Sequence, residues 1–342
     1  MSQFISEPSA DVMAAAASHL VAGGLVAFPT ETVYGLGADA CNALGVARIY
    51  SVKGRPADHP LIVHVASMDG LGEWADDVPG YAISLACDFW PGPMTLVLKR
   101  SSLAKDFITG GQETVGVRVP DHVVALALLE AFENLGGKGI AAPSANRFGQ
   151  VSPTTAAAVA EEIGEFLDSA DQIIDGGACA VGVESTIIDC TGDVPRILRP
   201  GAITVAMIEA STGQIVIKVS NTVVDSQEAA AGTPTSNLIS SAGTEIRVSG
   251  SLENHYAPAA KVLLCETPRP GQGFIAHVNM ETPAGVIRLA SPQNDEEFAQ
   301  ILYSALREAD AQGLKEVVVM QPIGIGIAVA IRDRLARAAN GR

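Results

Sequence analysis

The chain is short of basic residues. Its 342 residues include 22 Lys and Arg against 38 Asp and Glu, so the formal net charge is −16. A protein that coats nucleic acid non-specifically needs a basic face, because its affinity comes from phosphate contacts. The composition therefore argues against strong direct nucleic-acid binding, and we expect any RNA contact to be local or made through a partner.

Cysteine is scarce and follows no pattern. The chain has no CxxC pair and no His/Cys spacing typical of a metal site. The five cysteines are Cys41, Cys87, Cys179, Cys190 and Cys265. An odd, unpatterned set favours reduced, partly buried thiols in a cytoplasmic protein over a disulfide framework or a structural metal.

A membrane segment is also missing. The uncharged stretch 12–30 contains Gly23, Gly24 and Pro29, and the residues before it are acidic rather than basic. Neither a signal peptide nor a spanning helix has these features. The pattern instead predicts a helix, a Gly-Gly stop and a buried strand in a soluble protein.

Several common catalytic signatures are absent too. The sequence contains no GxxxxGK[ST], HExxH or GxSxG motif and no protein-kinase signature. The first of these motifs cradles nucleotide phosphates in many enzymes. If this chain binds a nucleotide, it must hold the phosphates in another way.

Apolar residues, by contrast, are plentiful. The chain is 48% hydrophobic and 18% charged, which allows a large core and argues against disorder. A length of 342 residues suits two domains. A small, polar, turn-rich run over 217–250 reads as a partly mobile linker. We therefore predict domains at 1–215 and 259–342, joined by a linker over 216–258.

In the first two hundred residues, short apolar runs alternate with helical patterns, which is typical of an α/β domain. The predicted helices are 14–22, 43–52, 123–135 and 154–167. Ser152-Pro153-Thr154 is expected to cap the last of them. The predicted strands are 25–28, 61–65, 95–98, 115–119, 173–174, 186–189 and 196–198. Together they should form a mixed sheet.

The chain after residue 258 predicts a second, smaller α/β domain with a parallel sheet. The expected strands are 261–264, 284–289 and 316–320, and the expected helices are 295–311 and 327–339. Gly324-Ile325-Gly326 opens the last helix but lacks the GxGxxG spacing. Glycines that permit a tight turn are therefore favoured over a dinucleotide site.

Polar residues gather in glycine- and proline-rich loops after the predicted elements. These loops are Phe28–Gly37 (FPTETVYGLG), Lys53–Arg55, Ser144–Asn146, Gly182–Thr186 (GVEST) and Arg199–Gly201. Each is commonplace alone, since a lone Lys-Gly-Arg is usually a solvated turn and a Ser-Ala-Asn usually a helix cap. Together they favour a polyanion site, because such sites are built from loops on a rigid sheet.

In this order and spacing, the loops resemble the YrdC-like family, the threonylcarbamoyl-AMP synthases. The resemblance covers about residues 10–215. His255-Tyr256-Ala257-Pro258 and the domain after it look like the two-domain form of that family. The resemblance implies a twisted mixed α/β sheet with an open, positively charged cavity, followed by a smaller Rossmann-like α/β domain.

The resemblance also implies an activity, that of a nucleotidyltransferase. Family members condense L-threonine with bicarbonate or CO2 and adenylate the carbamate with ATP, releasing pyrophosphate. The product serves the threonylcarbamoyladenosine modification of tRNA, for which a dedicated transferase partner passes the group on. Mg2+ is expected with ATP, held mainly by the phosphates because Mg2+ keeps its waters. No protein-built metal site is expected.

Site residues carry over by position. The family's Lys-x-Arg and Ser-x-Asn pairs are Lys53, Arg55, Ser144 and Asn146. When one anion approaches another, fixed cations are needed to offset the repulsion. The first pair is therefore expected to bind the negative charges of the phosphates and the carbamate. The second pair should supply orienting hydrogen bonds. Lys53→Ala and Arg55→Ala are each expected to lower turnover by orders of magnitude with little change in melting temperature.

Two further groups of residues match the family's substrate contacts. The threonine pocket is expected to contain Thr30, His64 and Ser185, with Arg118 on the carboxylate. The nucleotide contacts are expected to be Lys53, Thr114, Ser144, Ser152, Arg199 and Tyr256. Thr114 and Arg118 should face the same side of one strand, because side chains alternate. Glu31 and Glu184 could help to hold Mg2+, although structural hydrogen bonding fits them equally well.

The linker end 255–258 could cover the cavity. A mixed anhydride hydrolyses easily, so a lid pinned by Tyr256 on the triphosphate would protect it. A plain spacer between domains is the alternative.

Two other functions stay open at this point. The fold could serve a non-catalytic RNA-binding or ribosome-associated protein. A carbamoyl-transferring relative is disfavoured, because the zinc-binding and acylphosphatase-like regions usual in such proteins are not found.

Overall fold

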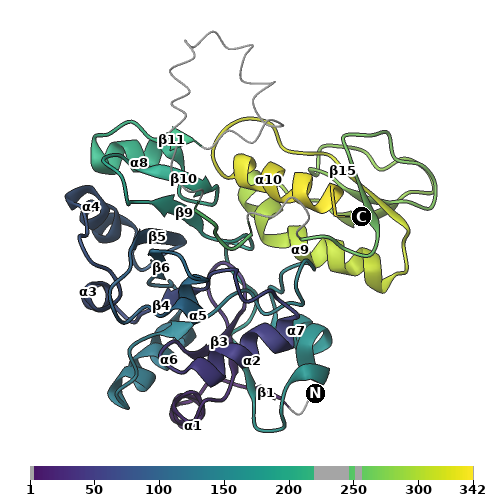
Figure 1. Ribbon diagram of the computed structural model, residues 1–342. Helices are drawn as coiled ribbons and strands as arrows, with labels where there is room; N and C mark the ends of the chain where they lie inside the picture. The colour runs from purple at the N-terminus through teal and green to yellow at the C-terminus, as the bar shows by residue number, and fades with distance from the viewer. Residues whose placement is uncertain (1–3, 219–245, 251–255, 342) are drawn as a thin grey trace.

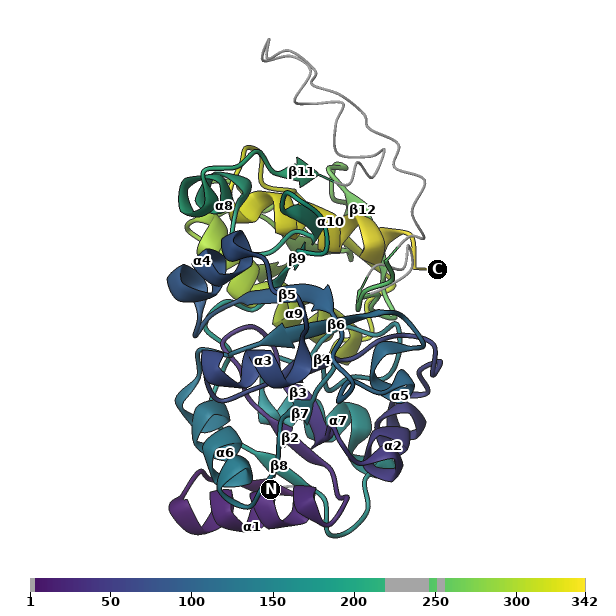
Figure 2. The same ribbon diagram turned by 60° about the vertical axis from the view of Figure 1, so that its left-hand side comes forward.

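The computed structural model describes residues 4–218, 246–250 and 256–341. They form a large unit on an 11-stranded mixed sheet and a smaller unit on a 4-stranded parallel sheet. Figures 1 and 2 show the two units packed side by side. The predicted fold class is confirmed.

The large sheet has the strand order β1-β8-β2-β3-β7-β4-β6-β5-β9-β10-β11. Its strands are β1 (Ile5–Ser6), β2 (Val26–Phe28), β3 (Gly35–Asp39), β4 (Ile62–His64), β5 (Met94–Lys99), β6 (Thr114–Arg118), β7 (Ile140–Ala141), β8 (Gln172–Ile174), β9 (Thr186–Asp189), β10 (Arg196–Arg199) and β11 (Ile217–Lys218). Its helices are α1 (Ala10–Val21), α2 (Ala43–Lys53), α3 (Leu71–Trp74), α4 (Gly80–Phe89), α5 (Asp106–Thr109), α6 (Val123–Asn134), α7 (Ala156–Ile163) and α8 (Val205–Thr212), with short 3-10 turns at Met68–Gly70 and Gly164–Phe166.

The pairing of β4 with β6 matters most for the site. These strands are parallel and in register, with His64 opposite Arg118 at their carboxyl ends. Loops after parallel strands therefore open at the same edge, where polar side chains can converge.

Local signals explain how the Lys53–Arg55 loop begins. Asn42 caps α2 by accepting hydrogen bonds from the N–H groups of Leu44 and Gly45. Gly54 ends the helix in the left-handed conformation, with φ of 61°, which glycine adopts without strain. Lys53 is thus the last helical residue, and Arg55 leaves in another direction.

Some predicted boundaries are wrong. The cap of α7 is Thr155, whose side chain accepts from the Ala158 N–H, and not the predicted Ser152-Pro153-Thr154. Residues 284–286 precede β14, which is Ile287–Ala290. The FPTETVYGLG segment contains a strand, β3, where a loop was expected. A Cβ at Gly37 would come within 2.8 Å of the Phe28 ring, so glycine there allows close packing inside β3.

The smaller unit has the strand order β12-β15-β13-β14, all parallel. Its elements are β12 (Lys261–Leu264), β13 (Gly273–Ile275), β14, α9 (Asp295–Ala311), β15 (Glu316–Val319) and α10 (Ile327–Ala339). Both helices have the predicted bounds. Gly324 and Gly326 have φ of 104° and 80°, which confirms that these glycines serve a tight turn.

Of the predicted linker, residues 217–218 and 246–250 lie against the large unit, whereas Tyr256 also packs on Tyr303 of α9. Ile217–Lys218 pairs with β10 as an edge strand. Residues 219–245 and 251–255, including His255, lie outside the described residues. Val248 packs on Val97 and Ile187. The domain division at 215 and 258 stays a prediction.

The two units share part of a hydrophobic core. Val33, Val151 and Val183 of the large unit pack in one cluster with Phe298 and Tyr303 of α9. Within the described residues, no helix combines the length and apolarity needed to span a membrane.

Candidate active site

A cavity lies at the carboxyl ends of β4 and β6, where the loops that contain the predicted site residues meet. It has about 530 Å³ of empty space, counting its opening to solvent. The predicted site residues in its lining are Thr30, Arg55, His64, Arg118, Ser144, Ser185, Arg199 and Tyr256. The structure thus brings most of the predicted set together from loops far apart in the chain.

Lys53 lies behind the wall of this cavity. Its side chain is almost fully buried, and Nζ donates to the carbonyl oxygens of Ser144 and Asn146, each at 2.5 Å. Burial, reinforced by the Arg55 charge, lowers its pKa well below the usual range. Lys53 therefore supports the Ser144–Asn146 loop, and the expected direct contact with phosphate would need this loop to move.

Asn146 also points away from the lining. Its Nδ2 donates to the carbonyl oxygens of Arg147 and Gln150, at 2.7 and 2.9 Å. Ser144, in contrast, is half-buried in the lining and forms a backbone bridge with Gly35. The Ser-x-Asn pair is therefore split, with one member in the cavity and the other shaping the loop.

Arg55 is buried in the lining. Its Nη2 donates to the Pro60 carbonyl oxygen at 2.9 Å and to Ser249 Oγ at 3.1 Å. Its Nε is buried with no partner among the described residues. Burial, reinforced by the Arg199 charge, lowers the pKa of Arg55 to about 10, so it stays cationic at neutral pH.

Arg199 lines the same cavity as Arg55, and backbone carbonyl oxygens hold its guanidinium in place. Its Nε and Nη2 donate to the Ser185 carbonyl oxygen at 3.1 and 3.0 Å, and Nη1 donates to that of Ser249 at 2.8 Å. Burial lowers its pKa. Ser185 Oγ accepts from Arg199 Nη2 and shares a hydrogen bond with Thr95 Oγ1 at 2.8 Å. Two fixed cations thus face one space.

His64 and Arg118 lie side by side at the strand ends. Burial and the neighbouring Arg118 lower the pKa of His64 to about 3, so its imidazole is neutral. Its Nδ1 is buried without a partner among the described residues. Arg118 Nη2 pairs with Glu31 Oε1 at 2.6 Å, while Glu31 Oε2 accepts from the Asp121 N–H. Glu31 therefore serves structural bonding.

Thr30 organises its own loop. Its hydroxyl donates to the Val33 carbonyl oxygen at 2.7 Å and accepts from the N–H groups of Thr32 and Val33. This local hydrogen bonding holds the FPTETVYGLG loop in a turn. Thr30 lines the cavity through a side chain that is already engaged.

Glu184 lines the cavity, and Ser152 lies behind it. The Ser152 hydroxyl is buried and donates to Glu184 Oε1 at 2.6 Å. Burial alone would raise the pKa of Glu184, but Arg334, Arg199 and Ser152 outweigh it and lower the pKa to about 2. The Ser152 hydroxyl is thus bonded to Glu184. In this arrangement the hydroxyl does not point into the cavity to make the expected contact with nucleotide.

Tyr256 forms one wall. Its ring stacks on Tyr303 at 5.8 Å between centroids, and Arg334 lies 5.2 Å from the same ring. Two further linker residues, Ser249 and Gly250, also line the cavity, and the sequence analysis did not assign them to the site. The turn-rich composition of the linker carries no sign of this contact.

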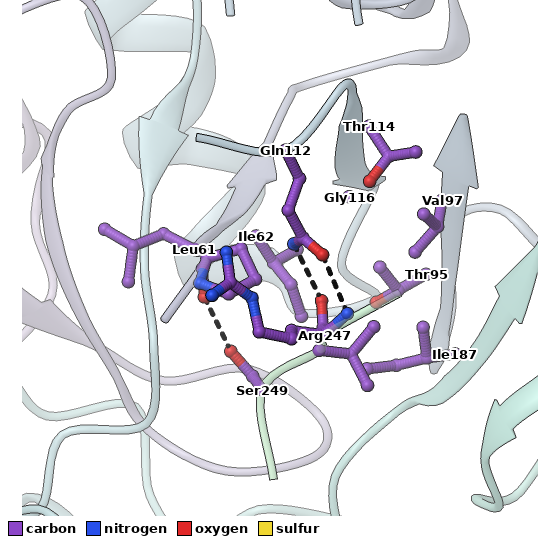
Figure 3. Close-up of a pocket in the computed structure, with 12 residues that line it drawn as sticks. Leu61, Ile62, Thr95, Val97, Gln112, Thr114, Gly116, Ile187, Arg247 and Ser249 are labelled. Carbon is purple, nitrogen blue, oxygen red and sulfur yellow. Dashed lines mark hydrogen bonds between the residues drawn. The ribbon is translucent and has the colours of Figure 1, made fainter. Parts of the chain in front are cut away.

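Thr114 lies in a groove that adjoins the cavity and shares Ile62 and Ser249 with it. Figure 3 shows residues 247–249 running through this groove. Gln112 exchanges two hydrogen bonds with the Arg247 backbone, at 3.0 and 2.8 Å. Thr114 and Arg118 therefore share a strand face, as predicted, but line different parts of the space.

Metal ligands and disulfides do not mark this site. No cluster of three or more His, Cys, Asp and Glu side chains suited to a metal occurs in the described part of the chain. The five cysteines are free thiols, and Cys179 and Cys190 are buried. The arrangement is that of a small cationic cavity with a neutral imidazole, suited to an anionic ligand with polar groups.

Comparison with known families extends over both units. The family model described as "Telomere recombination" (Sua5_yciO_yrdC) matches residues 18–201. The model described as "Threonylcarbamoyl-AMP synthase, C-terminal domain" matches residues 203–340. The chain is 41% identical to a threonylcarbamoyl-AMP synthase of Pyrococcus abyssi, over 96% of this chain and 94% of that protein. A Bacillus subtilis protein of the same name is 38% identical, over 96% and 93%.

Solved structures agree with these similarities. The crystal structure of P. abyssi Sua5 complexed with L-threonine has a TM-score of 0.82 to this chain at 36% identity, and it covers 99% of this chain and 98% of its own. A doubly substituted variant of the same P. abyssi protein has a TM-score of 0.81.

Proposed function

The chain belongs to the threonylcarbamoyl-AMP synthase family, and from this premise we propose that it forms threonylcarbamoyl-AMP and pyrophosphate from L-threonine, bicarbonate or CO2 and ATP. It would act as a nucleotidyltransferase in the threonylcarbamoyladenosine modification of tRNA, in a reducing cytoplasm where its five thiols stay free. The observation that carries this proposal is the convergence of Arg55, Arg199, Ser185 and His64 on one cavity.

The chemistry brings two anions together. A carbamate oxygen attacks the α-phosphorus of ATP, and the bond from that phosphorus to the bridging oxygen of pyrophosphate breaks. Arg55 and Arg199 would stabilise the charge on the phosphates, because fixed cations in a buried site need no reorganisation during the reaction. Their backbone hydrogen bonds keep both guanidiniums in place.

L-Threonine would lie on the His64 side of the cavity. Neutral His64 has a buried ring nitrogen that bonds to none of the described residues and so can bond a substrate polar group, and Ser185 Oγ is a second polar partner. A polar partner for the threonine hydroxyl discriminates better than an apolar pocket does. Arg118 is proposed for the carboxylate, although Glu31 already neutralises much of its charge.

Lys53 and Asn146 act on the reaction through the loop that carries Ser144. Holding that loop positions Ser144 against the substrates, and positioning contributes strongly to rate. Tyr256 would contact the nucleotide from the linker side, and Thr114 and Ser152 would contribute only after local movement.

Mg2+ would enter with ATP. Glu184, which lines the cavity, is paired with Arg334, and Glu31 is paired with the lining residue Arg118. They offer no free oxygen cage, so the ion would be held by phosphate oxygens and water. Its bound charge would supply further phosphate neutralisation.

The cationic residues suit a small substrate better than RNA. Lys53, Arg55 and Arg199 are all buried, whereas a nucleic-acid surface needs exposed cations along the phosphate backbone. A dedicated transferase partner would therefore carry the group to tRNA.

Pyrophosphate release from ATP tests the proposal. We expect release to require both L-threonine and bicarbonate, with serine a poorer substrate. Release that is indifferent to threonine would contradict the proposed reaction. Tight, salt-sensitive RNA binding without turnover would support the RNA-binding alternative instead.

A further inference from the structure

Glu184 stands where the two units meet. It lines the cavity, and its carboxylate accepts hydrogen bonds from Tyr303 Oη and Arg334 Nε, both at 2.8 Å. Tyr303 belongs to α9 and Arg334 to α10. The smaller unit therefore contacts a wall residue of the cavity directly.

The same two residues flank Tyr256. The ring of Tyr303 stacks on it, and the guanidinium of Arg334 lies over it. Arg334 is fully buried and also donates through Nη2 to the Pro200 carbonyl oxygen at 2.9 Å. One side chain from α10 thus contacts the loops before β9 and after β10, as well as the end of the linker.

The loop that carries Glu184 sits directly on α9. A Cβ at Gly182 would lie 2.4 Å from the Gln300 Cα and 2.6 Å from the Ala299 carbonyl oxygen, and Gly182 has φ of 79°. No other residue fits both the space and the backbone conformation. Contact with the α9 backbone therefore fixes the position of the Gly182–Ser185 loop relative to the cavity.

This loop in turn holds a cation of the cavity. The Ser185 carbonyl oxygen accepts both Nε and Nη2 of Arg199. A continuous set of contacts runs from α9 and α10, through Glu184 and Ser185, to the Arg199 guanidinium.

We propose that the smaller unit completes the active site, with Tyr303 and Arg334 as positioning residues that hold Glu184, Arg199 and Tyr256 in their catalytic arrangement. This inference rests on the proposed function, since it concerns the same cavity. A buried ion pair often adds little net stability compared with apolar packing. Precise placement of the Gly182–Ser185 loop accounts for the pair more directly.

The decisive variant is Tyr303→Phe, which removes one hydroxyl and keeps the ring. Its matched control is Glu162→Gln, which weakens another contact between the units, that of Glu162 Oε2 with Arg307 Nη1 at 2.9 Å, without touching the cavity. We expect Tyr303→Phe to lower kcat/KM for threonine-dependent pyrophosphate release about ten-fold, as for one lost hydrogen bond to a charged group. Glu162→Gln should stay within about two-fold of wild type.

Arg334 provides a second, graded test. Arg334→Met should lose more activity than Arg334→Lys, because lysine restores the charge beside Glu184 but not the fork that reaches Pro200. Both are assayed at saturating substrates well below their melting temperatures, so that a fall in kcat reports positioning and not loss of folded protein. Equal activity of the two Arg334 variants would count against the proposal.

Hydrogen–deuterium exchange gives a readout that does not depend on turnover. Peptides 182–189 and 256–260 should exchange faster in Tyr303→Phe and at the wild-type rate in Glu162→Gln. Two results would overturn the inference. One is wild-type kinetics and exchange in Tyr303→Phe, and the other is an equal loss of kcat/KM in Tyr303→Phe and Glu162→Gln. A wild-type protein without threonine-dependent release would refute the proposed function instead, and the exchange comparison would still decide this point.

Discussion

Replacing Lys53 with methionine removes a side-chain nitrogen that donates hydrogen bonds to two backbone carbonyl oxygens. The Ser144 and Asn146 oxygens each lose a donor at 2.5 Å, in a place that water does not reach. A buried polar group left without a partner costs about 1–3 kcal/mol. Part of the cost for the two carbonyl oxygens is offset, because the variant no longer buries a lysine side chain, which is itself unfavourable. We therefore expect a net destabilisation of about 3 kcal/mol.

That destabilisation should be visible in the melting temperature. At about 2–4 °C per kcal/mol, Lys53→Met should melt about 6–12 °C below wild type in a calorimetric scan. Turnover at 25 °C should fall about 100-fold, because the loop that carries Ser144 is no longer held in place. The sequence alone predicts the same loss of turnover with an almost unchanged melting temperature, so the scan separates the two accounts.

Lys138→Met is the matched control. Lys138 is half exposed and pairs with Glu73 at 2.9 Å on the surface. We expect its melting temperature to stay within about 2 °C of wild type, since surface ion pairs contribute little. If the Lys53→Met variant has the melting temperature of wild type but no activity, the structural role of Lys53 is refuted. The prediction that Lys53 contacts the substrate directly would then stand.

Three other outcomes are expected. Arg199→Lys should lower kcat/KM for ATP about 100-fold in steady-state assays, because one ammonium cannot replace a fork bound to Ser185 and Ser249. An unchanged value would exclude Arg199 from the reaction. His64 has a folded-state pKa of about 3 against an ordinary 6.5, so the folded state resists protonation, and its stability contribution is complete above pH 6.5 and falls as pH drops toward 3. Urea titrations should show wild type losing roughly 1 kcal/mol per pH unit more than His64→Gln in that window, and parallel curves would contradict the assignment. Gly182→Ala should lower both the melting temperature and the turnover, because its methyl group would overlap the α9 backbone; a variant that keeps both would show that this contact can relax.

Local patterns were sufficient for much of the fold. Helices α9 and α10 begin and end where their apolar periodicity and flanking residues predict, because a helix face is encoded by residues three and four apart. The missed elements include the helices α4 and α8 and the strand β3, whose Gly35 and Gly37 resemble loop residues. Their form depends on packing partners distant in the sequence.

The residue types of the site, and hence its chemistry, were readable from the motif loops and their order. Their orientation was not. Whether Lys53 faces substrate or supports the Ser144–Asn146 loop depends on contacts about ninety residues apart. Tyr303 and Arg334 carry no motif at all, and they reach Glu184 only because α9 and α10 pack against the large unit. Linear sequence specifies which groups are available, whereas burial and long-range packing decide which of them meet the cavity.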